Sequence, residues 1–163
     1  MSSTRPLFGL RRKPGRLALL LFRMPLMAYR RDAGWLFGRT FLEFIHIGRR
    51  TGRHYETVAM VLRYQPVTRE TVICAAWGAD TDWVRNLRAG PAVRVRLGRD
   101  SFTPAHRFLS EAEGFEVGVS FRRDHPWRLR LLSAILGWGD LRDDDALRTF
   151  VREHPLVAFR PAA

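Results

Sequence analysis

Residues 55–76 have the sequence YETVAMVLRYQPVTRETVICAA, which predicts two antiparallel strands joined by a short turn. In the first strand, Tyr55–Tyr64, bulky apolar side chains at every second position alternate with smaller ones. Proline and threonine then mark a turn, and the apolar run Glu70–Ala76 follows as the second strand. A hairpin of this kind favours an antiparallel sheet over a doubly wound parallel one.

Further strands are predicted on both sides of this hairpin. The apolar run Phe41–Ile47 has the length of a strand. In Ala92–Leu97, valine and leucine alternate with two arginines, so one face is expected to be buried and the other to face water. Phe102–Leu109 and Leu156–Phe159 are the remaining candidates. With helices between and after the strands, the pattern predicts an α+β, mainly β, fold with an antiparallel six-stranded barrel-like sheet.

An amphipathic helix is predicted near the N-terminus, because apolar residues over 17–28 recur at helical spacing. Arg16, Arg23 and Arg30 form a basic stripe along it, and Pro25 is expected to kink the helix or divide it in two. Two interpretations stay open. The helix lies on the domain with its arginines solvated, or it makes peripheral contact with anionic lipid. It is too short to span a membrane, which takes roughly 20 apolar residues.

Later helices are indicated by their caps and their periodicity. The sequence GADT at residues 78–81 caps a short helix, and Ser110 with Glu113 forms a capping box for the next one. The last helix begins at the acidic residues 143–145. The helix before it is expected to bury one face, formed by Trp127, Leu131, Ile135 and Trp138.

The length of 163 residues fits a single domain, assigned to residues 17–163 after a flexible basic segment over residues 1–16. No secretory signal is evident. The single cysteine, Cys74, excludes an internal disulfide and lies in an apolar run, where a buried and inert thiol is expected. We therefore expect a cytoplasmic protein, with peripheral membrane association as the open alternative.

The chain is strongly basic, with 28 lysines and arginines against 16 acidic residues and a net charge of +12. All of the basic residues except Lys13 are arginines, whose planar guanidinium can bind two oxygens at once. This excess predicts an anionic partner: a phosphorylated cofactor, nucleic acid or an acidic membrane surface. The tryptophans fall at apolar helix positions and not along an exposed strip, which counts against nucleic acid.

The most informative segment is the turn between the first two strands, Gly48-Arg49-Arg50-Thr51-Gly52-Arg53. Its two glycines allow a tight and left-handed backbone path, and three guanidiniums and a hydroxyl project from it. Such a turn can present N–H groups and arginines to a phosphate, or it can be an ordinary basic hairpin turn; spacing alone leaves both open. Neither a Walker A pattern nor a G-x-G-x-x-G motif after a strand is present.

A second informative segment follows the third strand. Small residues in Ala75-Ala76-Trp77-Gly78 let a flat ring approach the backbone, and the helix start beside them offers free N–H groups to an anion. Trp83 and Asn86 share a face of that helix. Core packing is the alternative for Trp83, whereas Asn86 needs a polar partner if it is buried.

Together these segments resemble the deazaflavin (F420)-dependent nitroreductase family, within the flavin and deazaflavin oxidoreductase superfamily. The resemblance covers roughly residues 30–110 and is carried by GWLFG at residues 34–38, GRRTGR at 48–53, Trp83, NLRAGP at 86–91 and VRV at 93–95. It implies a split β-barrel that binds coenzyme F420, an 8-hydroxy-5-deazaflavin with a phosphate and an oligoglutamate tail. Monomers and homodimers are both compatible with such barrels.

The resemblance also implies a set of cofactor-binding residues. The phosphate and tail would be held by the arginine turn, namely Arg49, Arg50, Thr51, Gly52 and Arg53. The same site would be shaped by Trp83, Asn86 and Arg88. The deazaflavin ring would be flanked by Thr57, Val58, Ala59, Met60, Ala75, Ala76, Trp77 and Gly78.

The implied activity is F420H2-dependent hydride transfer to a hydrophobic acceptor, either quinone-like or a nitro compound. The protein's task is then to hold donor and acceptor about 3–3.5 Å apart, exclude water and supply a proton. Solvent or Tyr55 could supply that proton. Relatives that reduce nitroimidazoles have arginine where this chain has Tyr55, Ser-Lys where it has Trp77-Gly78, and a tyrosine-rich segment unmatched in residues 121–140. The cofactor class therefore carries over better than the substrate.

Two alternatives remain at this stage: a split barrel that binds FMN or lipid without deazaflavin chemistry, and a basic nucleic-acid-binding domain. No metal is expected, because none of the five histidines has the spacing of a zinc ligand. His54, beside the arginine turn, could touch a cofactor. Phe121, Trp127 and Trp138 are expected to be helix core, or else to line a hydrophobic acceptor pocket.

Overall fold

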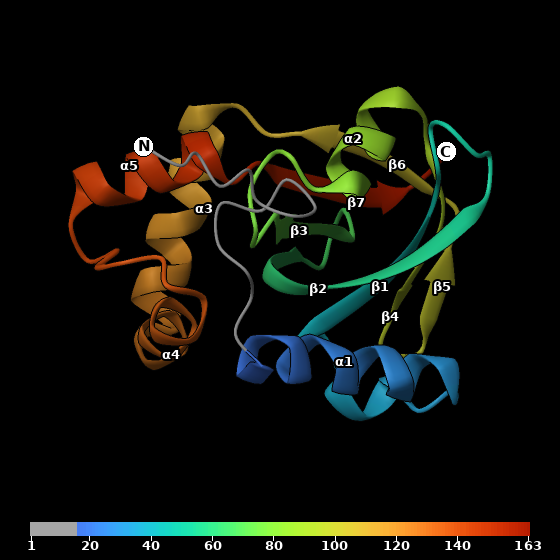
Figure 1. The fold of residues 1–163 in the computed structure, drawn as a ribbon, viewed down its shortest axis with the longest axis horizontal. Coiled ribbons are helices and arrows are strands. Elements are labelled where there is room, and N and C mark those ends of the chain that lie inside the picture. Colours follow the sequence, from blue (N-terminus) through green and yellow to red (C-terminus); the bar gives the residue numbers. More distant parts are fainter. Residues whose placement is uncertain (1–15) are drawn as a thin grey trace, which may run out of the picture.

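The computed structural model describes residues 16–163 (Figure 1). The flexible basic segment expected over residues 1–16 therefore lies, except for Arg16, outside the described residues. Seven strands form one antiparallel sheet in the order β5-β4-β1-β2-β3-β7-β6. Their bounds are β1 Phe41–Ile47, β2 His54–Gln65, β3 Glu70–Cys74, β4 Ala92–Leu97, β5 Asp100–Phe102, β6 Pro104–Phe108 and β7 Leu156–Pro161.

The sheet curls until it nearly closes on itself, because β4 and β6 also come into contact. Strand β2 makes this possible, since it pairs with β1 through its first half and with β3 through its second half, across a bulge between Val61 and Arg63. Bulges of this kind bend a strand and increase its twist. The predicted antiparallel barrel-like sheet is thus confirmed.

One predicted strand is in fact two. We expected Phe102–Leu109 to be continuous, but β5 pairs with β4 at one edge of the sheet, whereas β6 pairs with β7 at the other. The chain passes between the two edges at Thr103, just before Pro104, which has no N–H to continue a ladder. The alternation of side chains along this segment indicates extended backbone but not a change of partner. The strand count is therefore seven and not six.

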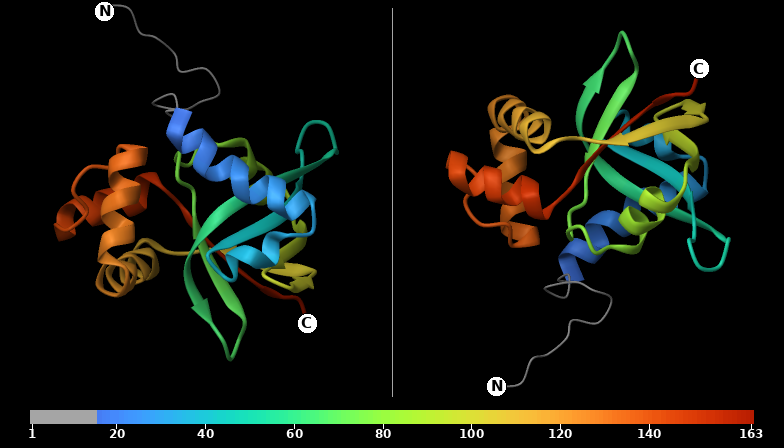
Figure 2. Two further views of the ribbon diagram at one scale, coloured as in Figure 1. Left: turned by 90° about the horizontal axis from the view of Figure 1, so that it is seen from below. Right: turned by 90° about the horizontal axis from the view of Figure 1, so that it is seen from above.

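The interior of the barrel is an apolar core built from alternate residues of the strands. It includes Leu42 and Phe44 of β1, Ile73 of β3 and Phe159 of β7, all fully buried. Leu87 closes this core from α2, Asp82–Ala89, which lies on the opposite side of the sheet from α1, Arg16–Arg30 (Figure 2).

Three helices pack together at one end of the barrel (Figures 1 and 2). Helix α3, Glu111–Asp124, begins with the predicted capping box of Ser110 and Glu113. Helix α5, Asp144–Glu153, begins at the N-cap Asp143, whose carboxylate accepts from the backbone N–H of Ala146. With α4, Pro126–Leu136, they bury a second core that also contains Cys74, and this burial raises the pKa of the thiol to about 12.

The buried face of α4 differs from the one that we expected. Trp127 and Leu131 are 63% and 51% exposed, whereas Leu129 and Leu132 face the core. Trp138 lies beyond the helix, where its indole N–H donates to the carbonyl of Ala76 over 3.0 Å. The helix carries a second apolar face with Leu129 and Leu132, and spacing alone does not decide which face is buried. Trp138 does not share a face with the helix, because Gly137 ends it in a left-handed conformation.

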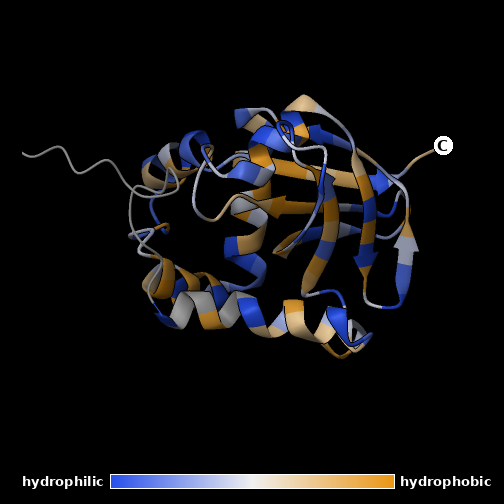
Figure 3. Cartoon of the chain, turned by 45° about the vertical axis from the view of Figure 1, so that its right-hand side comes forward, coloured by the Kyte–Doolittle hydropathy of each residue, from blue (hydrophilic) through white to orange (hydrophobic). Residues whose placement is uncertain are grey.

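Helix α1 continues through Pro25 as one element, so the proline does not divide it. Its C-terminal half packs on a small core of Tyr29, Phe41 and Val58, with the 3-10 helix η2, Gly34–Phe37, directly after it. In the C-terminal half of α1 hydrophobic residues are interspersed with hydrophilic ones, as they are along several of the strands (Figure 3). Within residues 16–163 no helix has the length and apolar character to cross a membrane.

Candidate functional site

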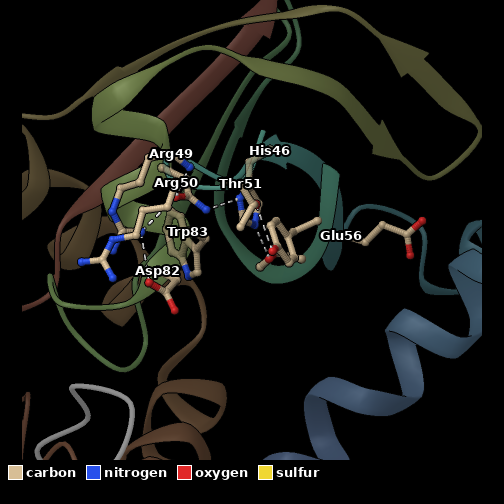
Figure 4. A pocket seen from close by; sticks show the side chains of 11 residues that line it. His46, Arg49, Arg50, Thr51, Glu56, Asp82 and Trp83 are labelled. Carbon is tan, nitrogen blue, oxygen red and sulfur yellow. Dashed lines mark hydrogen bonds and ion pairs between the residues drawn. The ribbon is translucent and has the colours of Figure 1, made fainter. Parts of the chain in front are cut away.

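A cleft of about 460 Å³ opens at the mouth of the barrel, where β1 ends, β2 begins and α2 starts (Figure 4). The arginine turn, residues 48–53, connects β1 to β2 at this mouth. The cleft is lined by His46, Gly48, Arg49, Arg50, Thr51, Tyr55, Glu56, Thr57, Asp82, Trp83 and Asn86. Its size lies within the range of roughly 300–1,000 Å³ that is usual for small-molecule sites.

Both glycines of the turn are required by its geometry. Gly52 has a φ of +66°, in the left-handed region that other residues rarely adopt. A Cβ on Gly48 would lie 2.6 Å from both Thr51 Oγ1 and Tyr55 Cε2, so the Tyr55 ring can approach only because the side chain is absent. The backbone N–H groups of Thr51 and Gly52 both donate to the carbonyl of Gly48, which closes the turn.

Two arginines of the turn are held differently. Arg49 is tied to α2: its guanidinium donates to Asp82 and Asn86 over 3.0 Å each, and its backbone N–H donates to Asn86 Oδ1 over 3.1 Å. Arg50 is exposed, and its side chain makes no hydrogen bond or ion pair with any of residues 16–163. The Asp82 carboxylate offsets the charge of Arg49, so Arg50 carries an unneutralised positive charge at the edge of the cleft.

The floor of the cleft is polar and almost fully buried. Asn86 and His46 are 4% and 3% exposed, and Asn86 Nδ2 lies 3.0 Å from His46 Nδ1. His46 Nε2 in turn lies 3.0 Å from Thr57 Oγ1. The expectation that a buried Asn86 needs polar partners is confirmed. Burial lowers the pKa of His46 to about 4 although the Asp82 charge acts in the opposite direction, so the ring is neutral at physiological pH.

Aromatic side chains form the walls of the cleft. The rings of His46 and Tyr55 are stacked at 5.9 Å between centroids, and Trp83 packs edge-on against the buried ring of Phe44 at 5.3 Å. Tyr55 OH lies 3.3 Å from Thr51 Oγ1. A cleft with flat aromatic walls and an unneutralised guanidinium at its edge suits a planar ring that carries an anionic arm.

Seven of the sequence-predicted site residues line this cleft: Arg49, Arg50, Thr51, Tyr55, Thr57, Trp83 and Asn86. Gly52 and Arg53 belong to the same turn but are not part of the lining. Figure 4 shows Arg49 and Arg50 on the same side as Trp83 and Asp82.

The remaining predicted residues lie elsewhere in the structure. Val58 and Ala59 are buried in β2, and Met60 packs against the cores on its two sides. Arg88, on the exposed side of α2, stacks over Phe108 at 5.2 Å. Ala75 is buried and Gly78 lies in the loop before α2.

Ala76 and Trp77 line a separate cleft of about 600 Å³ between the end of β3 and the helices at the end of the barrel. Trp138, Phe150 and His154 form its aromatic part, with Phe150 and His154 stacked at 4.1 Å. The second informative segment is therefore divided between two clefts, because Trp83 and Asn86 lie beside the arginine turn whereas Ala76 and Trp77 do not.

Sequence reasoning did not identify His46, Glu56 and Asp82 as parts of the site. For His46 a signal existed, because Leu42 and Phe44 predict an inward-facing apolar residue at position 46, where the chain has a histidine. Glu56 and Asp82 had no such signal. Glu56 lies toward α1 and pairs with Arg30 over 3.0 Å (Figure 4). Among residues 16–163, no group of three or more His, Cys, Asp or Glu side chains is placed to hold a metal ion.

Several solved structures are similar to this chain at low sequence identity. The structure described as an F420-H2 dependent reductase (FDR-A) is 19% identical over 76% of this chain and 96% of its own, with a TM-score of 0.45. An FMN-binding protein related to pyridoxamine 5'-phosphate oxidase from Nostoc punctiforme is 12% identical over 93% of this chain and 82% of its own, with a TM-score of 0.43. No curated protein sequence matches the chain.

A family model provides the decisive comparison. The model described as F420H(2)-dependent quinone reductase matches residues 21–117, more than half of the chain, and includes all of the residues that line the cleft at the barrel mouth. The chain therefore belongs to the F420H(2)-dependent quinone reductase family and is an oxidoreductase that uses coenzyme F420.

Proposed function

We propose that this protein transfers a hydride from reduced F420 to a hydrophobic organic acceptor of the quinone or nitroaromatic type, in the cleft at the barrel mouth. The observation that carries the proposal is the position of Arg50, an unneutralised guanidinium at the edge of a cleft with aromatic walls. F420 combines the two chemical features that such a cleft fits, a flat ring and a negatively charged arm.

The described residues fit that cofactor. Arg50 and the side chain of Thr51 are placed to hold the phosphate and the acidic tail, because a guanidinium binds such oxygens strongly and a hydroxyl can donate to them. Gly52 and Arg53 would support the same arm from the outer side of the turn. Trp83 and Tyr55 would contact the ring. In this arrangement F420H2 supplies the hydride, and the protein supplies position and charge.

The chain's own residues contribute by orientation more than by acid–base chemistry. Arg49 is held by Asp82 and Asn86, so the turn is anchored before any ligand arrives. The aromatic walls formed by Trp83 and Tyr55 would cover the bound ring and keep water away from it. Tyr55, 43% exposed and stacked on His46, is the described side chain placed to pass a proton to the acceptor. Effective catalysis by positioning needs no catalytic dyad.

The acceptor preference is tested by mixing the protein with F420H2 and either a soluble quinone or a nitroaromatic compound. Reoxidation of F420H2 is followed by the absorbance of the deazaflavin. We expect quinone turnover that is lost in Trp83→Ala and Arg50→Ala. Turnover with neither acceptor, while F420 still binds, would contradict the proposed acceptor class. Saturable binding of FMN but not F420 would favour the flavin alternative. Equal binding of any polyanion, seen only at low salt, would favour nonspecific electrostatic attraction in place of a cofactor site.

A second proposal concerns membrane contact. On α1 the side chains of Leu20, Met24 and Met27 are all about half exposed, and they lie one turn apart on one side of the helix. Trp35 and Leu36 of the adjoining η2 are exposed as well. Exposed arginines accompany this apolar stripe, among them Arg23, Arg30 and Arg31. An apolar stripe with basic residues beside it favours peripheral binding to an anionic bilayer, where hydrophobic acceptors are found.

A further inference from the structure

A chain of hydrogen bonds runs from the arginine turn through the floor of the cleft to β2. Arg49 donates to Asn86 Oδ1 from its backbone N–H over 3.1 Å and from its guanidinium over 3.0 Å. Asn86 Nδ2 lies 3.0 Å from His46 Nδ1, and His46 Nε2 lies 3.0 Å from Thr57 Oγ1. The four residues come from the turn, α2, β1 and β2, so four elements converge on this chain.

The direction of the first two bonds is determined by Arg49. Its backbone N–H and its guanidinium can only donate, so the oxygen of the Asn86 amide must face them. The NH2 group of that amide therefore faces His46, and it too can only donate. His46 Nδ1 is consequently an acceptor without a proton.

The direction of the third bond follows from the charge of His46. Burial keeps the ring neutral, and a neutral imidazole carries one proton, which here must be on Nε2. His46 Nε2–H therefore donates to Thr57 Oγ1. The hydroxyl of Thr57 accepts this bond and retains its own proton for another partner.

The hydroxyl proton of Thr57 has no acceptor among residues 16–163. Thr57 is half-buried and lines the cleft. A hydroxyl that is held as an acceptor on one side is free to donate on the other. The cleft is the open space beside it.

We propose that Thr57 donates a hydrogen bond to the ligand in the cleft, and that Arg49, Asn86 and His46 are positioning residues that hold it in this donor state. The ligand must then present an acceptor at this point, either a carbonyl oxygen or an unprotonated ring nitrogen at the edge of a flat ring. Identifying that ligand as the deazaflavin rests on the proposed function. A ligand that places a methyl group there is disfavoured, because it would cover the hydroxyl of Thr57 and leave its proton without an acceptor.

The direction of the chain can be measured without a ligand. Nitrogen-15 NMR of the imidazole of His46 distinguishes the two neutral tautomers, and we expect the proton on Nε2. In Asn86→Asp the carboxylate can only accept, so the His46 proton should move to Nδ1 and Thr57 should donate to Nε2. A proton on Nδ1 in the unmodified protein would overturn the proposal.

The contact with ligand is tested by titrating oxidised F420 into five proteins: unmodified, Thr57→Val, Thr57→Ser, Asn86→Asp and the double variant of Thr57→Val with Asn86→Asp. Thr57→Val should weaken binding about 5- to 20-fold, and Thr57→Ser should restore it, because one hydrogen bond is lost and regained. In the Asn86→Asp background, Thr57→Val should change affinity less than twofold, since Thr57 no longer faces the ligand as a donor. The four affinities other than that of Thr57→Ser form a double-mutant cycle, in which the effect of the charge added by Asn86→Asp on its own cancels.

Two outcomes count against the proposal in different ways. Equal affinity of the unmodified protein and Thr57→Val would overturn the role of Thr57 and leave the proposed function standing. An unmodified protein that does not bind F420 would overturn the proposed function and the identity of the ligand, whereas the NMR measurement would still decide the direction of the chain.

Discussion

Arg96 of β4 binds the carboxylate of Glu43 of β1 through two guanidinium nitrogens, one of them at 2.9 Å, in a part of the sheet where Glu43 is only 1% exposed. The same guanidinium donates to the carbonyl of Tyr29 at the end of α1 over 2.6 Å. The pair therefore joins two strands and a helix. The hydrogen bond to Glu43 raises the pKa of Arg96 above its already high value, so the guanidinium stays charged.

Replacing one member of this pair should be costly. Arg96→Leu leaves a buried carboxylate without its counter-charge, and we expect the free energy of unfolding to fall by about 3–5 kcal/mol. Urea denaturation of Arg96→Leu, of Glu43→Leu and of the double variant measures these free energies. The double variant should recover much of the loss. Single variants that each cost less than about 1 kcal/mol would show that the pair contributes little.

The turn should depend on the missing side chain of Gly48. In Gly48→Ala the new methyl group would lie 2.6 Å from the Tyr55 ring, so the ring must move and the free energy of unfolding should fall by about 1–3 kcal/mol. Gly90→Ala is the matched control, because no atom lies within 4 Å of its added Cβ. If thermal denaturation gave the same midpoint for both variants, the close approach of Tyr55 to the turn would not be supported.

His46 should make stability depend on pH. Its pKa of about 4 in the folded protein lies below the value of about 6.5 expected for the unfolded chain, so the unfolded chain takes up the proton first. The stabilisation is complete above about pH 6.5 and is lost as the pH falls toward 4. Between pH 7 and pH 5 the loss should be about 2 kcal/mol. Urea titrations of the unmodified protein and His46→Gln measure the difference, and identical pH profiles would contradict the assignment.

Much of this architecture could be predicted from the sequence. The hairpin of residues 55–76, the capping box at Ser110 and the acidic start of the last helix at residues 143–145 are local signals, and all three are present in the structure. The arginine turn and the face of α2 with Trp83 and Asn86 could also be predicted, and both line the same cleft. These features depend on residues close together in the chain, where spacing and backbone preference act directly.

The remainder depends on contacts between distant segments. The division of the predicted strand at Thr103 follows from the closure of the sheet, which no local pattern encodes. His46 joins the site through Asn86, 40 residues away. Trp77 and Trp83 are close in sequence, yet the loop at Gly78 directs them into different clefts.

Membrane contact is tested by cosedimentation with vesicles that contain anionic lipid. Met24→Glu combined with Met27→Glu places two negative charges on the exposed face of α1, and we expect binding to fall at least about tenfold, because apolar burial and attraction to the lipid charge are both lost. Val67→Glu is the control, since Val67 is 91% exposed in the β2–β3 turn, away from α1. Equal sedimentation of all three proteins would contradict a role for α1.

The central claim is that Arg50 binds the anionic arm of F420. Isothermal titration of oxidised F420 into the unmodified protein, Arg50→Ala and Arg160→Ala tests it most directly, because the two variants lose the same charge and only Arg50 lines the cleft. We expect Arg50→Ala to weaken binding about 10- to 100-fold, as for a lost charge-assisted contact, and Arg160→Ala to leave affinity within about twofold. Equal weakening in both variants would mean that net charge, and not this cleft, attracts the cofactor.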